Sequence, residues 1–112
     1  MNGHSLDRLT DEHLAAAREH ASGRSAVTVH GGREHHLRQT LIALAGGRSL
    51  GEHESPGEAT LQVLRGRVRL HAGDETWEGG PGDLLLIPPQ RHDLEALDDA
   101  AVLLTVANRL AD

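Results

Sequence analysis

The sequence predicts an all-β fold, a single small sandwich or barrel preceded by one short helix. After Ser25 the chain forms about eight short runs of β-type composition, and glycine, proline or aspartate separates them. Strands do not alternate with helices, so a parallel βαβ sheet is not expected. At 112 residues the chain suits one domain with its own core. We expect a helical segment over residues 1–24 and one β domain over residues 25–112.

The N-terminal segment has the signals of a single amphipathic helix. Ser5 can cap it, because a serine oxygen accepts a hydrogen bond from a free backbone N–H of the first turn. Leu6, Leu9 and Leu14 form a narrow apolar stripe, and Ser22-Gly23 ends the run. A helix with so narrow a stripe is expected to lie against the barrel or against a second subunit.

Turn residues mark the ends of the expected strands. The 72–75 segment, Ala-Gly-Asp-Glu, predicts a hairpin turn, and 84–87 is a continuous apolar run that predicts a strand buried on both faces. The expected strands are 26–30, 37–44, 59–64, 68–71, 76–78, 84–87, 92–97 and 101–107.

Composition excludes several classes of function. The net charge is −6, there is no lysine and the arginines are scattered, which argues against a nucleic-acid surface. With no cysteine, disulfides and thiolate metal sites are excluded. No signal peptide is visible, and no segment has the roughly 20 apolar residues that cross a bilayer, so we expect a cytoplasmic protein without a membrane partner. Trp77 is the sole aromatic residue, so the core must be aliphatic.

Two segments each join a histidine to a short strand with glycine or proline at the corners. The first, 53–66, begins with His53 and ends with Gly66; the second, 82–92, begins with Gly82 and ends with His92. Together they resemble the two motifs of the cupin family, over about residues 37–107. The resemblance implies a single cupin-type β-barrel (jelly-roll) and a homodimer.

The resemblance also implies a metal site, which this sequence matches only in part. In metal-binding cupins the first motif supplies two histidines one residue apart and a glutamate, and the second motif supplies a third histidine. His53 and His92 match, whereas Ser55 stands in place of the second histidine and Ala59 in place of the glutamate. A divalent transition metal (Fe, Mn, Ni or Zn) would therefore be held by His53 and His92. Candidates for a further ligand are Glu58, Gln62 and His71.

Three functions follow from this degenerate motif. We expect a protein that binds a small molecule in a pocket of His53, Ser55, Gln62 and His92. The alternative is a metal-dependent enzyme of the dioxygenase or isomerase type, with His53 and His92 as ligands. The third is a structural dimer with a vestigial pocket. The two missing ligands favour the first over the second, and the two matched histidines weigh against the third.

Two further groups of residues have open interpretations. Arg38 and Thr40 share one face of a strand, because alternate residues point the same way, and they either line a pocket for an anionic ligand or form a solvated face. By the same rule His35 and His36 point to opposite faces and are not expected to serve one site.

Overall fold

The computed structural model describes residues 1–55 and 57–107, in which one helix and eight strands occur. Pro56 of the first motif and residues 108–112, which end the segment expected for the barrel, lie outside the described residues. The expected helix and strands are confirmed, and their ends differ from the expectation by about one or two residues. The elements are α1 (Leu6–Glu19), β1 (Arg24–His30), β2 (Leu37–Leu44), β3 (Glu58–Arg65), β4 (Val68–Ala72), β5 (Glu75–Gly79), β6 (Leu84–Leu86), β7 (Asp93–Ala96) and β8 (Ala100–Ala107).

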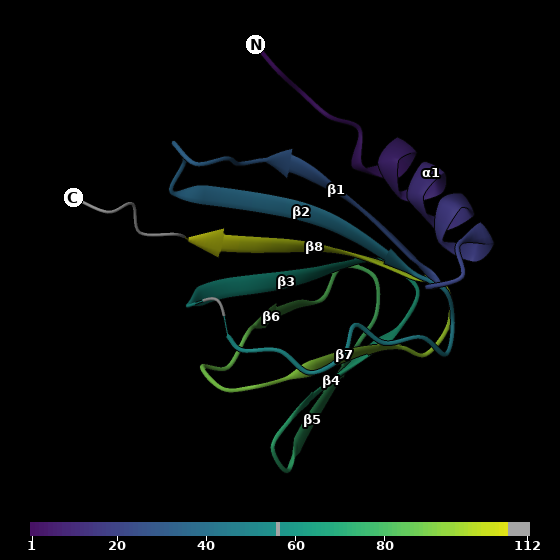
Figure 1. The fold of residues 1–112 in the computed structure, drawn as a ribbon, viewed down its shortest axis with the longest axis vertical. Coiled ribbons are helices and arrows are strands. Elements are labelled where there is room, and N and C mark those ends of the chain that lie inside the picture. Colours follow the sequence, from purple (N-terminus) through teal and green to yellow (C-terminus); the bar gives the residue numbers. More distant parts are fainter. Residues whose placement is uncertain (56, 108–112) are drawn as a thin grey trace.

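The strands form two antiparallel sheets that face each other. The larger has five strands in the order β1-β2-β8-β3-β6, and the smaller has three in the order β5-β4-β7. Figure 1 shows the larger sheet above the smaller one, with α1 outside the larger sheet beside β1. The fold is therefore the expected all-β barrel with a short N-terminal helix.

Aliphatic side chains from the inner faces of both sheets fill the core. Burial of each Leu or Val side chain contributes about 1.5–3 kcal/mol. Trp77 of β5 is partly buried and packs against this core. The core includes Leu44, Val63 and Val102 of the larger sheet and Val68, Leu70 and Leu94 of the smaller sheet.

α1 lies against the outer face of the larger sheet. Ser5 caps it as predicted, its Oγ accepting a hydrogen bond from the Arg8 N–H at 3.2 Å. Leu14 and Ala17 of its narrow stripe are buried together with Ala43 of β2. In residues 1–55 and 57–107 no helix is long and apolar enough to cross a membrane.

The prediction of a strand buried on both faces at 84–87 is wrong. β6 is the edge strand beside β3, and Leu84 and Leu86 are 62% and 73% exposed. Leu85 is half-buried, and Ile87, which follows the strand, is buried. The apolar run does not alternate, so the sequence could not show that one face of this edge is uncovered.

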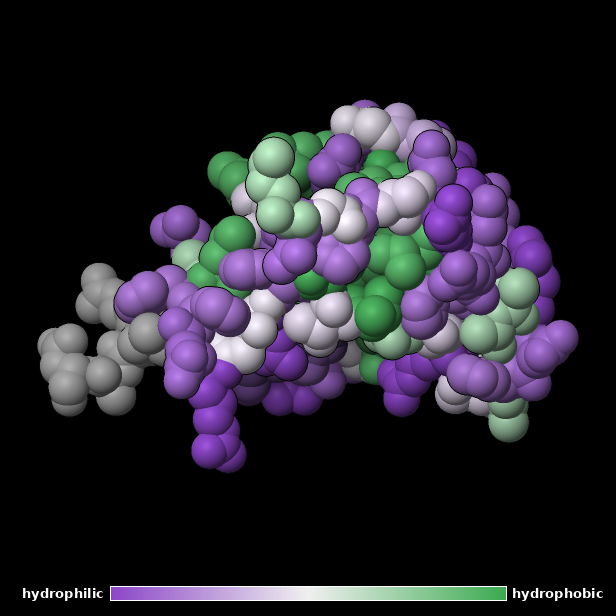
Figure 2. Space-filling view, turned by 90° about the horizontal axis from the view of Figure 1, so that it is seen from above, coloured by the Kyte–Doolittle hydropathy of each residue, from purple (hydrophilic) through white to green (hydrophobic). Residues whose placement is uncertain are grey.

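Figure 2 shows apolar (green) side chains that reach the surface between hydrophilic ones on the face seen from above.

The two ends of the barrel differ. At one end, which we call the closed end, the turns around Gly46, Gly66 and Asp99 are joined by hydrogen bonds. The Gly46 N–H donates to Asp99 Oδ1 at 2.8 Å, and the Arg67 N–H donates to Asp98 Oδ1 at 2.6 Å. Gly66 has φ +73°, and a Cβ there would overlap the carbonyl oxygen of Asp99. The carboxylates of Asp98 and Asp99 therefore join the turns of this end.

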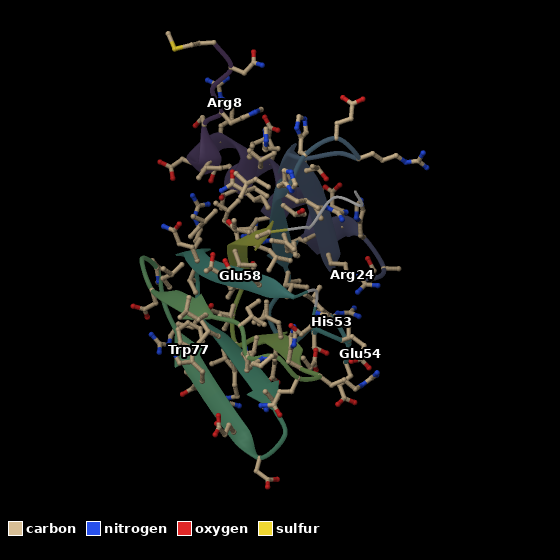
Figure 3. The ribbon with its side chains drawn as sticks, turned by 90° about the vertical axis from the view of Figure 1, so that its left-hand side faces the viewer. Arg8, Arg24, His53, Glu54, Glu58 and Trp77 are labelled. Carbon is tan, nitrogen blue, oxygen red and sulfur yellow. The ribbon has the colours of Figure 1, made fainter. Side chains whose placement is uncertain are left out.

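The opposite end, which we call the mouth, carries the first residues of β2 and β3 and the loops that contain the two motif histidines. Leu37 of β2 and Glu58 of β3 both pair with Ala107 of β8, which places the three strand ends together. Figure 3 looks at this end of the barrel.

Candidate functional site

His53 and His92 meet at the mouth, as the two motifs predict. They form an isolated antiparallel bridge: the His53 N–H donates to the His92 carbonyl at 3.0 Å, and the His92 N–H donates to the His53 carbonyl at 3.1 Å. Their rings lie edge to face, with centroids 4.5 Å apart. His92 is 3% exposed, whereas His53 lies at the surface. The bridge thus joins two loops that are far apart in sequence.

Backbone carbonyls fix which ring nitrogen of each histidine carries the proton in the neutral form. Nδ1 of His53 lies 2.9 Å from the Gly51 carbonyl oxygen, and Nδ1 of His92 lies 2.9 Å from the Gln90 carbonyl oxygen. A carbonyl oxygen only accepts, so Nδ1 must donate. In both neutral rings Nε2 is therefore left as a hydrogen-bond acceptor or metal ligand.

A cavity of about 320 Å³ opens beside this pair. Its size lies near the lower end of the range for small-molecule sites. Its floor is aliphatic and its rim is polar. The floor consists of Ile42, Leu50, Leu61, Leu70, Ile87, Leu94, Leu104 and Val106, and the rim of Arg38, Thr40, His53, Glu54 and His92.

Charge at the rim is only partly balanced within the protein. Glu54 accepts a hydrogen bond from Arg91 at 3.0 Å, and both side chains are largely exposed, so this ion pair is screened by solvent. The side chain of Arg38 forms no ion pair or hydrogen bond with any residue in the described ranges 1–55 and 57–107. Thr40 lies two residues further along the same face of β2.

The other expected pocket residues do not line the cavity. Ser55 is half-buried, and its hydroxyl donates to the Gly57 carbonyl at 3.2 Å. Gln62 is exposed on the outer face of β3, because it alternates with Leu61 and Val63, which face the core. The structure therefore brings His53 and His92 together and leaves Ser55 and Gln62 outside the cavity lining.

The candidates for a further metal ligand also lie apart from the two histidines. Glu58 is exposed at the start of β3, and Figure 3 shows it away from His53 and Glu54. His71 points outward from the smaller sheet, where its Nε2 lies 3.2 Å from Glu95 Oε1. His35 stacks on His30 outside the cavity, with ring centroids 4.7 Å apart.

The residues present do not fit the four-ligand metal site that the motif resemblance implies. Serine at 55 and alanine at 59 offer no imidazole and no carboxylate. Among residues 1–55 and 57–107 no group of three or more His, Asp or Glu side chains is arranged to hold a metal ion. Two imidazoles alone leave most of the coordination shell of a divalent ion to water.

Asp99 titrates below the ordinary range, and it lies outside the cavity. Its pKa is lowered because the Gly46 N–H donates to its carboxylate and because Arg18 Nε binds it at 2.6 Å. This carboxylate belongs to the closed end, where it joins α1 to the turn before β8. It therefore serves structure rather than chemistry at the mouth.

Two kinds of cavity residue were not expected as site residues from the sequence. Glu54 lies in a loop, where no periodicity shows which way a side chain points. The floor combines Leu50, Leu70 and Leu94 with residues of the larger sheet. To predict this set, one must know how the two sheets face each other. For Gln62 a signal did exist, because its position between two aliphatic residues already indicates an outward face.

The chain is similar to known cupins in sequence and in structure. The family model of the cupin domain matches residues 40–107, more than half of the chain. No curated protein sequence matches the chain. A protein of unknown function from Streptococcus pyogenes is 26% identical, with a TM-score of 0.71 over 82% of this chain and 80% of that chain. An RmlC-like cupin from Desulfovibrio desulfuricans is 24% identical, with a TM-score of 0.71 over 96% of each chain.

One structural neighbour is a named enzyme. A salicylate 1,2-dioxygenase variant from Pseudoaminobacter salicylatoxidans is 22% identical, with a TM-score of 0.73 over 90% of this chain and 32% of that much longer chain. At this identity the likeness concerns the fold alone, because one fold carries many activities. Together with the motif positions of His53 and His92 and the two facing antiparallel sheets, the family match shows that the chain belongs to the cupin family.

Proposed function

We propose that this cupin domain binds a small organic molecule in the cavity at the mouth of the barrel. The observation that carries the proposal is the combination of an aliphatic floor with a short polar rim, in a cavity of about 320 Å³. An apolar pocket with a few convergent polar groups is the usual form of a small-molecule site. The floor provides most of the binding free energy, and the rim determines the orientation of the ligand.

The side chains at the mouth, two imidazoles without a third metal ligand beside them in the described residues, favour ligand binding without a resident metal. The metal-dependent alternative, a dioxygenase or isomerase with His53 and His92 as ligands, needs a third protein ligand, and the described residues 1–55 and 57–107 contain no group of three that could hold a metal ion. In the metal-free version the same imidazoles act through Nε2 as hydrogen-bond acceptors. That role requires only the geometry that the two backbone carbonyls already fix.

A fragment screen with a filled-cavity variant tests this proposal. Tag-free protein is labelled with ¹⁵N, treated with chelator and titrated with a library of small polar-apolar fragments, while backbone amide shifts are recorded. Fragments that bind should shift the amides of residues around the cavity. In Leu104→Trp the added ring occupies the floor, so these shifts should disappear or the affinity should fall at least tenfold.

The matched control is Leu97→Trp, which adds the same ring at an exposed position of the closed end. This variant should bind the fragments like the wild type. If Leu104→Trp and Leu97→Trp bind equally, or if no fragment shifts any cavity amide, the proposed function is wrong. Thermal unfolding of both variants shows that each is folded.

We further propose that the domain works as a homodimer, as small single-domain cupins usually do. This proposal rests on membership of the family and on no particular contact. Sedimentation velocity of the tag-free protein at micromolar concentration is expected to give the mass of two chains. A single species with the mass of one chain would contradict it.

A further inference from the structure

We infer that the ligand of the mouth is a small carboxylate that also carries a hydroxyl group. In this arrangement Arg38 binds the carboxylate, and the hydroxyl donates to Nε2 of His53 or His92. The inference rests on the proposed function, since it names the chemical class of the molecule that the cavity takes.

The first observation is the uncompensated charge of Arg38. Of the charged rim side chains, Glu54 already has Arg91 as a partner at 3.0 Å. Arg38 has none in the described part of the chain, although the protein as a whole carries an excess of acidic residues. A guanidinium in a cavity wall matches the planar, two-oxygen geometry of a carboxylate. A carboxylate of the ligand would balance the charge of the rim.

The second observation is the position of Arg38 on the cavity wall. Arg38 faces Val106 of β8 across the ladder, and both residues line the cavity. Gly31 leaves room for the stem of this side chain, because a Cβ at position 31 would be 3.0 Å from Arg38 Cγ. Arg38 is itself exposed, so its guanidinium is accessible to an anion that enters from solvent.

The third observation concerns the hydrogen-bond polarity of the two histidines that line the same cavity. Both neutral imidazoles present an acceptor at Nε2, because each Nδ1–H donates to a backbone carbonyl. A ligand group that faces them must therefore donate. A hydroxyl does so without bringing a second positive charge beside Arg38. A ligand with only a carboxylate would leave Nε2 of the buried His92 without a donor.

The cavity also limits the size of the ligand. A volume of about 320 Å³ lies near the lower end of the range for small-molecule sites, so the ligand is small. Since the floor is entirely aliphatic, a short hydrocarbon chain between the two polar groups suits it. Six-carbon compounds are therefore suitable probes.

The test compares four probes that share a six-carbon chain: 2-hydroxyhexanoate, 6-hydroxyhexanoate, hexanoate and 1,6-hexanediol. Dissociation constants are measured from amide shifts of tag-free, chelator-treated protein. We expect at least one hydroxy acid to bind more tightly than hexanoate, and at least tenfold more tightly than the diol. Arg38→Leu should weaken binding of the carboxylates at least tenfold and leave the diol unchanged.

Arg33→Leu is the matched control. Arg33 is exposed, forms no ion pair with any residue of the described ranges, lies outside the cavity and carries the same charge, so both variants change the net charge equally. Binding to Arg33→Leu should stay within twofold of the wild type. Arg38→Lys should recover part of the carboxylate affinity, because charge remains while the two-pronged geometry is lost.

The outcomes separate this inference from the proposed function. If the diol binds in the cavity as tightly as the acids, or if Arg38→Leu and Arg33→Leu behave alike, the carboxylate assignment is wrong while a small-molecule site remains. If neither hydroxy acid exceeds hexanoate, the hydroxyl assignment is wrong. If none of the four probes shifts a cavity amide at tens of millimolar, the inference fails, and the fragment screen with Leu104→Trp decides separately about the function.

Discussion

The closed end and the mouth of this barrel are built on different principles. At the closed end, side chains are used to fasten the backbone: Asp98 and Asp99 accept hydrogen bonds from the N–H groups of Arg67 and Gly46, and Gly66 leaves no room for a side chain. At the mouth, two backbone hydrogen bonds between His53 and His92 join the two loops. Each imidazole there bonds to a backbone carbonyl through Nδ1 and also lines the cavity. Asp98 and Asp99 of the closed end therefore lie outside the cavity, whereas the histidines of the mouth border it.

This difference explains how the first motif can fit the family in one half and depart from it in the other. Its last residue, Gly66, lies at the closed end, where the turn permits only glycine. Its ligand positions 55 and 59 lie towards the mouth, where serine and alanine are compatible with the same backbone. The backbone of the turn requires Gly66, whereas the family motif uses positions 55 and 59 to bind a metal. Residues 55 and 59 can therefore be substituted without a change in the fold.

The largest expected effect is that of an alanine at the closed end. Gly66→Ala combines an unfavourable positive φ with an overlap between its Cβ and the Asp99 carbonyl oxygen, and it should lower the free energy of unfolding by about 3 kcal/mol. Gly51→Ala at the mouth is the control: φ is +90°, but no atom lies within 4 Å of the added Cβ, so about 1 kcal/mol is expected. Urea unfolding of both variants measures the difference, and equal losses would contradict the contrast between the ends.

The next effect is a gain of metal affinity at the mouth. Ser55→His restores an imidazole at the position where the family motif has one, so Ni²⁺ or Zn²⁺ should bind at least tenfold more tightly than to the wild type. Adding His53→Ala should remove this gain, whereas His35→Ala should not, because His35 lies outside the cavity. Calorimetric titration of tag-free protein measures these affinities. Ser49→His, on an exposed loop, is the matched control, and an equal gain there would show that the mouth has no special geometry.

A smaller effect is expected from the loss of the Asp99 charge at the closed end, either by substitution or by acid. Folding lowers the pKa of Asp99, so its charged form stabilises the fold above the unfolded pKa of about 3.9, and this contribution is lost as the pH falls through the lower folded value. Asp99→Asn should lower the free energy of unfolding at pH 7 by at most about 1 kcal/mol, because the pair with Arg18 is partly exposed and screened. The difference between the two proteins should shrink below about pH 3.9. A difference that is independent of pH would mean that the charge has no role.

The smallest expected effect is that of Gln62→Ala. Since Gln62 lies on the outer face of β3, the affinity for 6-hydroxyhexanoate should stay within twofold of the wild type. His53→Ala, which removes one acceptor at the rim, should weaken the same binding severalfold. Amide shift titrations measure both. If loss of Gln62 weakens binding as much as loss of His53, the assignment of faces in β3 needs revision.

The sequence was sufficient for the fold because its turns are marked chemically. Glycines with positive φ at 47, 66, 73 and 82 separate the strands, and only glycine adopts this conformation readily. The meeting of His53 and His92 was also predictable, since both occupy family motif positions. The cavity floor was not, because Leu50 and Leu70 come from a loop and from the opposite sheet. Contacts between facing sheets leave no periodic signal in the chain.

The bridge between His53 and His92 has a further consequence for how such a protein can change. The two loops are tied by peptide groups, which every residue except proline provides, and not by the imidazoles themselves. A substitution at position 53 or 92 therefore keeps the bridge between the loops and loses only the hydrogen bond from Nδ1 to the Gly51 or Gln90 carbonyl. A library that varies residues 53 and 92 together, with proline excluded, should yield mostly folded proteins that differ in what they recognise.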